Sequence, residues 1–365
     1  DGHFAFNNYG TTLSFRHNFA KPNKNVTADL NYNWSNNSNN SEFSTQYFNL
    51  DNMPKTPLYQ QKITGGGTTR YFTGQTDYTN PINDKMKLEA GLRAAVRNYS
   101  SYNENFFYDA ANSKYLTIPG LDSKYQFQDQ VYAAYTTFSQ KINDFTYQLG
   151  GRIESSLYTG KLVDSNQAFK NSFPLSFFPS IFLTQKINDK QDIQLNYSRK
   201  INRPNFFQLI PYYNYTDSLN ISRGNPDLKP EFTSLFEFNY DVNFQKGNNL
   251  IATIYYRHTN DLITQFQYRT INPNPSKTDS IFLTSFANAN SSSAYGLEVT
   301  SLNNITRWWS LTANVNLYNS ELNGNNLQSN LNNQQVSWFG KLNNTFKLPA
   351  NYSIQFKGAC TSKTI

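Results

Sequence analysis

The chain has 365 residues, a formal net charge of +7 and a mean hydropathy of −0.67, and 16% of its residues are aromatic. It contains no run of 18 apolar residues, which excludes a transmembrane helix, and no convincing amphipathic helix. Cys360 is the single cysteine, so no disulfide forms within the chain, and the 32 Lys and Arg are too scattered for a nucleic-acid surface.

Short polar segments divide the chain at intervals of about 45 to 60 residues, which leaves room for two strands of about ten residues and one long loop. Short turns that alternate with long loops are typical of an antiparallel barrel in a bacterial outer membrane, where the short turns face the periplasm. The seven predicted tight turns are 21–24, 81–84, 141–144, 187–190, 245–248, 303–306 and 348–351.

Between these turns, apolar and polar residues alternate with the period of a β-strand. In 86–97, for example, Leu88 and Leu92 share one face while Arg93 and Arg97 share the other. Seven turns of this kind imply about fourteen antiparallel strands. The pattern recurs in 26–34, 145–154, 191–198, 231–244, 308–318 and 351–358.

Two architectures use such strands. A soluble sandwich buries the apolar face, whereas a membrane barrel turns it to lipid and turns the polar face to a watery lumen. Full charges on the polar face, aromatic residues near many strand ends and the alternating turn lengths favour the barrel. The residues expected to line its lumen are Arg93, Arg97, Arg152, Glu154, Glu237 and Asp241.

The predicted strands near the two ends of the chain indicate a partial barrel. The first clear strand, about 9–20, runs into a tight turn, and the last, about 351–360, runs out of one. Both chain ends then point outward, whereas a complete single-chain barrel normally keeps both in the periplasm. Residues 1–365 are therefore expected to form one partial barrel domain whose final strands are missing.

One long segment carries the most specific pattern. Residues 198–212 read SRKINRPNFFQLIPY and residues 224–232 read GNPDLKPEF. Prolines interrupt ladder pairing and glycine permits a turn, so a rigid extracellular loop over the lumen is expected. Structural roles in this loop are expected for Arg203, Pro204, Gly224, Asn225, Pro226, Pro230 and Glu231, and cargo contacts for Tyr212, Tyr213 and Tyr215.

Together with Phe-Pro-Ser at 178–180 and LGGRIE at 149–154, this segment resembles the TonB-dependent receptors, specifically the outer-membrane β-barrel family of that superfamily. The resemblance implies an all-β transmembrane barrel of about 22 strands whose lumen is blocked by an N-terminal plug, which is missing here. It also implies a multi-pass outer-membrane importer of a scarce, bulky nutrient.

The same resemblance implies the partners. These are the TonB–ExbB–ExbD complex, reached through the missing N-terminal region, the lipid bilayer, and a surface lipoprotein as a candidate. A passive porin-like barrel, or a structural barrel within a larger surface assembly, is the alternative.

Enzymatic motifs are absent from the sequence. Gly65-Gly66-Gly67 lacks the ending of a phosphate loop and is interpreted as a flexible loop, and the three histidines lie far apart. The Asn-rich segments 35–41 and 323–333 are interpreted as loops without calcium-loop spacing. No catalytic residue, metal or cofactor is therefore expected, and the chain is not expected to be an enzyme.

Overall fold

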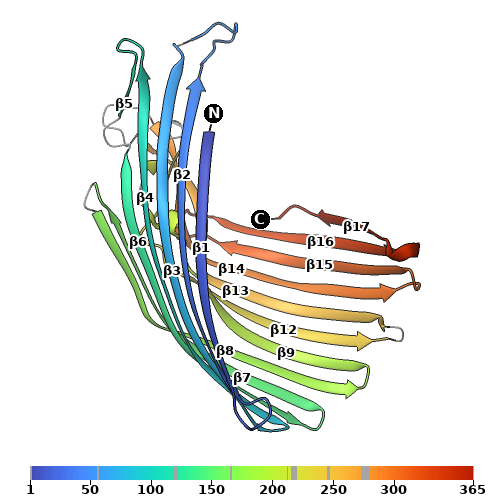
Figure 1. Cartoon of the computed structure of the whole chain (residues 1–365). Coiled ribbons are helices and arrows are strands. Elements are labelled where there is room, and N and C mark those ends of the chain that lie inside the picture. Colours follow the sequence, from blue (N-terminus) through green and yellow to red (C-terminus); the bar gives the residue numbers. More distant parts are fainter. Residues whose placement is uncertain are drawn as a thin grey trace.

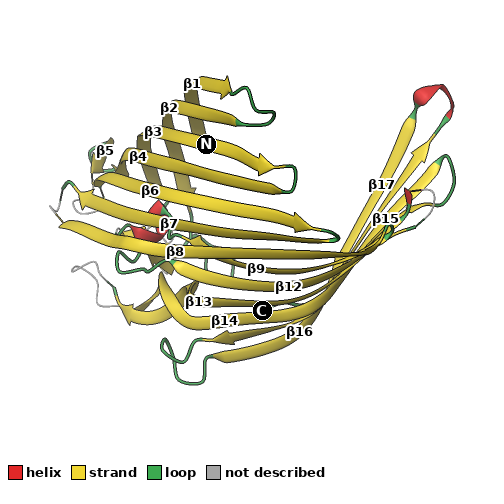
Figure 2. Cartoon of the chain, turned by 90° about the horizontal axis from the view of Figure 1, so that it is seen from below, coloured by secondary structure: helices red, strands yellow, loops and turns green. Residues whose placement is uncertain are grey.

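The computed structural model describes the whole chain except residues 1, 56, 118–121, 165–166, 212, 215–219, 245–246, 273–279 and 365, and the side chains of residues 214 and 220. Its strands form one sheet of 17, which curves into an open trough (Figures 1 and 2). Three strands are short: β5 (Lys114–Thr117), β10 (Tyr213–Asn214) and β11 (Asn220–Arg223). The helices are α1 (Phe206–Leu209) and the 3-10 turn η2 (Pro349–Asn351).

The other fourteen strands are long and form an antiparallel meander in chain order, which confirms the predicted strand number. They are β1 (Gly2–Asn18), β2 (Asn25–Thr45), β3 (Tyr59–Asn83), β4 (Met86–Asp109), β6 (Ser123–Ile142), β7 (Phe145–Leu162), β8 (Gln167–Asn188), β9 (Gln191–Asn202), β12 (Glu231–Asn243), β13 (Asn249–Ile271), β14 (Ser280–Asn304), β15 (Trp309–Asn323), β16 (Asn332–Lys347) and β17 (Ser353–Thr361). Within the described residues β1 pairs only with β2 and β17 only with β16, so the sheet has two open edges.

Tight turns join the strands at one end of the trough, here called the turn end, at six of the seven predicted places; the seventh, 245–248, lies partly outside the described residues. Two of them are made by Asn23 and Asn143, which have φ of 60° and 53°, a left-handed conformation that asparagine tolerates. The opposite end, the loop end, carries the long connections. Several strands are longer than the roughly ten residues that span a bilayer: β3 has 25 residues and β4 has 24.

Two segments that were interpreted as loops lie in these extensions. Gly65–Gly67 belongs to β3 and pairs with 37–39 of β2, which corrects both interpretations. The extended ladder between β2, β3 and β4 satisfies the backbone hydrogen bonds of these residues, so neither glycine nor asparagine needs a loop here.

The apolar face of the sheet is convex and exposed. Leu13, Leu92 and Ile254 have 65%, 59% and 59% of their surfaces exposed, and no second protein layer covers them in the described part of the chain. A soluble sandwich would bury this face, so the exposed face excludes that alternative. The main buried cluster lies instead inside the trough, around Phe127 and Tyr158.

No described helix is both long enough and apolar enough to cross a membrane.

Candidate functional site

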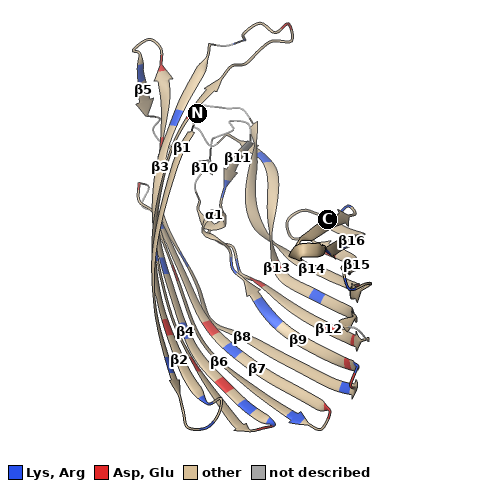
Figure 3. Cartoon of the chain, turned by 45° about the vertical axis from the view of Figure 1, so that its right-hand side comes forward, with Lys and Arg blue, Asp and Glu red and all other residues tan. Residues whose placement is uncertain are grey.

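The described residues of the connection from β9 to β12, which are 203–211, 213–214 and 220–230, fold into the trough instead of extending away from it (Figure 3). This connection carries α1, β10 and β11, and we call it the inner segment. A capping box starts α1: the Asn205 side chain accepts from the backbone N–H of Gln208 at 3.1 Å, and the Gln208 side chain accepts from the backbone N–H of Asn205 at 2.9 Å. The helix therefore begins at Phe206, with Asn205 as its N-cap and the buried Pro204 before it.

An ion pair fixes the start of the inner segment to the wall. The guanidinium of Arg203 pairs with the carboxylate of Glu154 on β7 and donates to the Ser156 hydroxyl at 3.2 Å. Arg152 donates to the same carboxylate at 2.5 Å, and Glu154 is only 6% exposed. Two cations around one buried carboxylate hold the segment to β7.

A second buried carboxylate fixes the end of the inner segment. Glu231, which is 8% exposed, accepts from the Asn202 side chain at 2.7 Å and from the backbone N–H of Ile263 at 2.6 Å. Pro230 beside it is fully buried. Glu231 thus joins β9, β12 and β13 where the inner segment returns to the sheet.

The Gly-Asn-Pro turn closes the inner segment on itself. A Cβ added to Gly224 would lie 2.3 Å from the carbonyl oxygen of Ile210, so only glycine fits. Asn225 donates from its backbone to the Gln208 carbonyl at 2.6 Å and from its side chain to the Phe286 carbonyl at 2.9 Å. The carbonyl of Pro226 accepts from Asn171 of β8 at 2.6 Å.

Apolar packing completes the attachment. Leu209 and Leu228 of the inner segment are almost fully buried and pack with Phe127 of β6 and Tyr158 of β7. Burying each of these leucines stabilises the segment by about 1.5–3 kcal/mol. The inner segment is therefore packed firmly against the wall of the trough in its loop-end half.

Between the inner segment and the β2–β4 wall lies a cavity of about 530 Å³. Gly66 is part of its lining, and a Cβ on the adjacent Gly65 would lie 2.5 Å from the side-chain oxygen of Asn39. The glycines thus leave room for the asparagine side chains of the neighbouring strand. The polar and aromatic lining residues include Asn37, Asn39, Ser41, Ser101, Asn103, Tyr125, Phe207 and Arg223.

This lining combines amide and hydroxyl groups with aromatic rings, which suits a polar ligand that also has an apolar face. No aspartate or glutamate lines it, and no cluster of metal-ligating side chains occurs in the described part of the chain. Phe207, 75% exposed, is the most accessible ring of α1. Sequence reasoning missed Phe207, although its neighbour Phe206 lies in the same motif and packs inward.

Of the predicted contact tyrosines, Tyr213 lies on β10, and Tyr212 and Tyr215 lie outside the described residues. The Tyr213 hydroxyl accepts from Arg223 at 3.0 Å, and that guanidinium lies 4.9 Å from the ring centroid. The ring also packs against the buried cluster around Ile221. In this structure Tyr213 is engaged within the inner segment.

The six charged residues predicted to line the lumen lie on the concave face. Register places Arg93 and Glu154 both opposite Ala133, and residues directly opposite each other in an antiparallel pair share a face. Arg97 forms an ion pair with Asp129, and the Arg152 guanidinium lies 5.3 Å from the Tyr135 ring centroid.

The remaining two lie on β12. Glu237 is opposite Asn196, and Asp241 accepts from Asn249 at 2.6 Å. Their role along a transport path stays a prediction.

Comparison with protein families gives one match over most of the chain. The model of the outer membrane protein beta-barrel family matches residues 17–365. No curated protein matches the chain significantly.

Solved structures share the fold at low identity. The ferric yersiniabactin uptake receptor FyuA from Yersinia pestis is 14% identical with a TM-score of 0.58, over 99% of this chain and 50% of that one. The copper transporter OprC is 16% identical with a TM-score of 0.61, over 93% and 50%. The unliganded ferric citrate transporter FecA is 12% identical with a TM-score of 0.62, over 98% and 49%. The chain thus spans about half the length of these structures, which are TonB-dependent receptors.

Proposed function

Because the chain belongs to the outer membrane protein beta-barrel family, we propose that it forms part of the wall of a TonB-dependent receptor that imports a scarce, bulky nutrient. The family match confirms the resemblance, the barrel class and the outer-membrane location that were predicted from the sequence. The turn end therefore faces the periplasm and the loop end faces outward.

The observation that carries the proposal is the inner segment. It is anchored at Glu154 and Glu231 and encloses, with the β2–β4 wall, a cavity on the extracellular half of the trough. A cargo molecule entering from outside meets this cavity first. FyuA is a ferric yersiniabactin uptake receptor, OprC a copper transporter and FecA a ferric citrate transporter, which supports import as the activity proposed here.

The proposal extends to parts of the receptor outside these residues. Both edges of the sheet are open and the similar structures are about twice as long, which supports a barrel completed by further strands and a plug. Energy would come through TonB, ExbB and ExbD, with a surface lipoprotein as a candidate partner. The charged concave residues Arg93, Arg97 and Glu237 would tune passage, and the chain would catalyse no reaction.

Uptake by cells that carry the full-length gene tests the proposal. The probes are labelled ferric siderophores, cobalamin, oligosaccharides and peptides, each offered to a deletion strain with and without the gene. We expect one probe to accumulate only with the gene and only while the proton-motive force is intact. The purified full-length protein should give no steady conductance in a planar bilayer. Open-pore conductance with uptake that ignores an uncoupler would establish the passive alternative.

A pair of variants tests whether the cargo binds in this cavity. Phe207→Ala removes the exposed ring of the cavity and should lower uptake at subsaturating probe about tenfold, since a buried aromatic contact contributes at least about 1.4 kcal/mol. The matched control is Phe356→Ala on β17, where the ring is 62% exposed on another part of the sheet. Equal uptake by the two variants would mean that the cavity is not the cargo site.

A further inference from the structure

The wall of the cavity beside the inner segment carries glycine between two strands that carry asparagine. Register places Gly65 of β3 directly between Asn39 of β2 and Asn103 of β4. A Cβ on Gly65 would lie 2.5 Å from the side-chain oxygen of Asn39 and 3.1 Å from that of Asn103. The two amide groups therefore converge over a bare stretch of backbone, and a larger residue at this position would push them apart.

A second row repeats this arrangement two residues nearer the turn end. Gly67 lies between Asn37 and Ser101, and a Cβ on it would lie 2.9 Å from the side-chain oxygen of Asn37. Ser101 is opposite Tyr125, whose ring packs on Phe206 of the inner segment at 5.5 Å between centroids. Directly opposite residues share a face, so both rows point into the trough, about 7 Å apart along β3.

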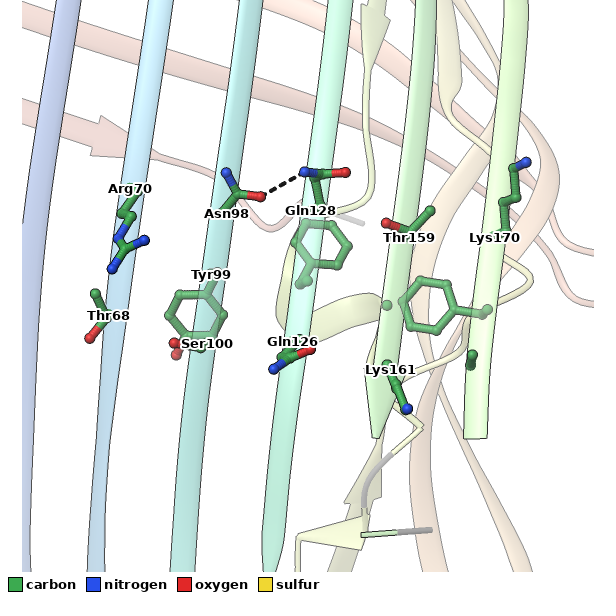
Figure 4. A pocket seen from close by; sticks show the side chains of 14 residues that line it. Thr68, Arg70, Asn98, Tyr99, Ser100, Gln126, Gln128, Thr159, Lys161 and Lys170 are labelled. Atoms are coloured by element: carbon green, nitrogen blue, oxygen red, sulfur yellow. Dashed lines mark hydrogen bonds between the residues drawn. The ribbon is translucent and has the colours of Figure 1, made fainter. Parts of the chain in front are cut away.

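The amides of these rows are unpaired, unlike amides on the other face of the wall. The side chains of Asn37, Asn39 and Asn103 are half-buried and form no hydrogen bond to any described residue. On the convex face, by contrast, Gln128 donates to Asn98 at 2.7 Å (Figure 4). An amide both donates and accepts, as a hydroxyl does, whereas a carboxylate only accepts and an ammonium only donates. The rows therefore match a ligand that is rich in hydroxyl groups.

The charge of the cavity also favours a neutral ligand. Among its lining residues, all of which lie in the described part of the chain, Arg223 is the single Lys or Arg, and there is no Asp or Glu. The Arg223 guanidinium already donates to the Tyr213 hydroxyl at 3.0 Å and lies 4.9 Å from the centroid of that ring. An anionic metal chelate or a charged peptide is held by several charged partners, and the cavity does not supply them.

Aromatic rings provide the apolar part of the lining. Phe207 lines the cavity from α1 with 75% of its surface exposed, and Tyr125 lines it from β6. A sugar ring carries hydroxyls around its edge and C–H groups on its faces, so it hydrogen-bonds through the edge and packs on an aromatic ring through a face. At about 530 Å³ the cavity has the size of a small-ligand site and accommodates a short chain of such rings.

We propose that this cavity binds a neutral oligosaccharide, and that Asn37, Asn39 and Asn103 determine its specificity. The sugar chain lies along β3, so that successive rings meet the two amide rows while one ring packs on Phe207. The two glycines of β3 keep the strip open for it. The proposal rests on the import function proposed above and names the class of its cargo.

Isothermal titration calorimetry on the purified full-length protein in detergent tests the site, with maltohexaose, cellohexaose, xylohexaose and mannohexaose as probes. We expect at least one probe to bind the wild type, and to bind the double variant N37L/N39L at least tenfold more weakly. Leucine keeps a branched side chain at these positions and removes its hydrogen-bonding groups. The control N36L/N40L makes the same changes on the convex face of the same strand and should bind like the wild type.

Two further measurements keep the test independent of folding and identify the ligand class. A heat-dependent gel shift shows whether each variant folds, and Gly65→Ala, which crowds Asn39 and Asn103, should also weaken binding. The affinity should change less than about twofold between about 0.05 and 0.5 M NaCl, because screening does not act on a neutral ligand. Ferric citrate should not compete with the bound probe.

Three results would each overturn the proposal: no binding of any of the four probes, equal binding by N37L/N39L and N36L/N40L, or an affinity that falls steeply with salt. Failure of the cargo class and failure of the import function give different results. Pmf-dependent import of a ferric siderophore without oligosaccharide binding would retain import and overturn the cargo class. Oligosaccharide binding without pmf-dependent uptake would retain the site and overturn import.

Discussion

The concave and convex faces of the β3–β8 wall use their charges differently. On the concave face Glu154 is buried between Arg152 and Arg203, so each charge has a partner. On the convex face Arg70 and Lys170 are exposed and form no ion pair within the described residues. A buried charge must be paired because desolvation is costly, whereas an exposed one is free to meet a ligand. The buried ion pairs of Glu154 therefore hold the inner segment to the wall.

The largest expected loss of unfolding free energy comes from disrupting the packing of the inner segment against the concave face. Gly224→Val would drive a side chain into the Ile210 backbone, so we expect a loss of about 3 kcal/mol or more of unfolding free energy. Trypsin added to intact cells should then cleave the segment after Arg223. Gly358→Val on β17 is the control, because an added Cβ there meets nothing within 4 Å. Equal trypsin resistance of the two variants would contradict the packing described here.

The second effect is the loss of the buried carboxylate. Glu154→Gln leaves Arg203 and Arg152 without their shared partner, and we expect about 2 kcal/mol lower unfolding free energy, reduced because both arginines are partly exposed. Urea titration of the full-length protein in detergent measures it. Glu237→Gln, on the same face but without an ion pair in the described residues, should change the midpoint far less. Similar losses of unfolding free energy for the two variants would show that the ion pairs of Glu154 do not stabilise the protein more than an unpaired charge does.

A smaller effect is expected on the convex face. Arg70→Gln should change the unfolding free energy by no more than about 0.5 kcal/mol in lipid-free detergent, because the side chain is exposed and unpaired. A large loss without lipid would show that this charge stabilises the wall itself.

The smallest effect is expected at the β8–β9 turn, which lies at the periplasmic end. Lys186 donates to Asp189 at 2.6 Å and lowers the pKa of that exposed carboxyl below its usual value. A lowered pKa contributes stability at neutral pH that is lost as the pH falls through the folded-state pKa. Because solvent screens the pair, we expect the urea midpoints of Asp189→Asn and the wild type to coincide at about pH 7 and at about pH 4. Midpoints that diverge with pH would show that even exposed pairs stabilise this barrel.

Much of the wall could be predicted because strand alternation and turn residues depend on neighbouring positions in the chain. Alternation such as Leu88 and Leu92 against Arg93 and Arg97 repeats every two residues, and Asn143 is suited to its turn. The upper strands were not predictable in the same way. Gly65–Gly67 resembles a loop in isolation and is a strand only because β2 and β4 pair with it on both sides.

The residues of the candidate site were likewise only partly predictable from the sequence. The motif residues Arg203, Gly224 and Glu231 stood out in the sequence, but their partners Glu154 and Ile263 lie 49 and 32 residues away along the chain. Phe207 could not be chosen over Phe206, since only the fold of α1 decides which ring is buried.

The sequence by itself determined the class of this protein. Period-two alternation, short turns and a distinctive motif depend on neighbouring residues, and these suffice to predict an antiparallel barrel of the outer membrane. Tertiary structure alone decided which charges meet. The folding of the β9–β12 connection into the trough brings Arg203 to Glu154 of β7, and strand register brings Arg97 of β4 to Asp129 of β6. Such pairings depend on strand order and stagger, which no local pattern specifies.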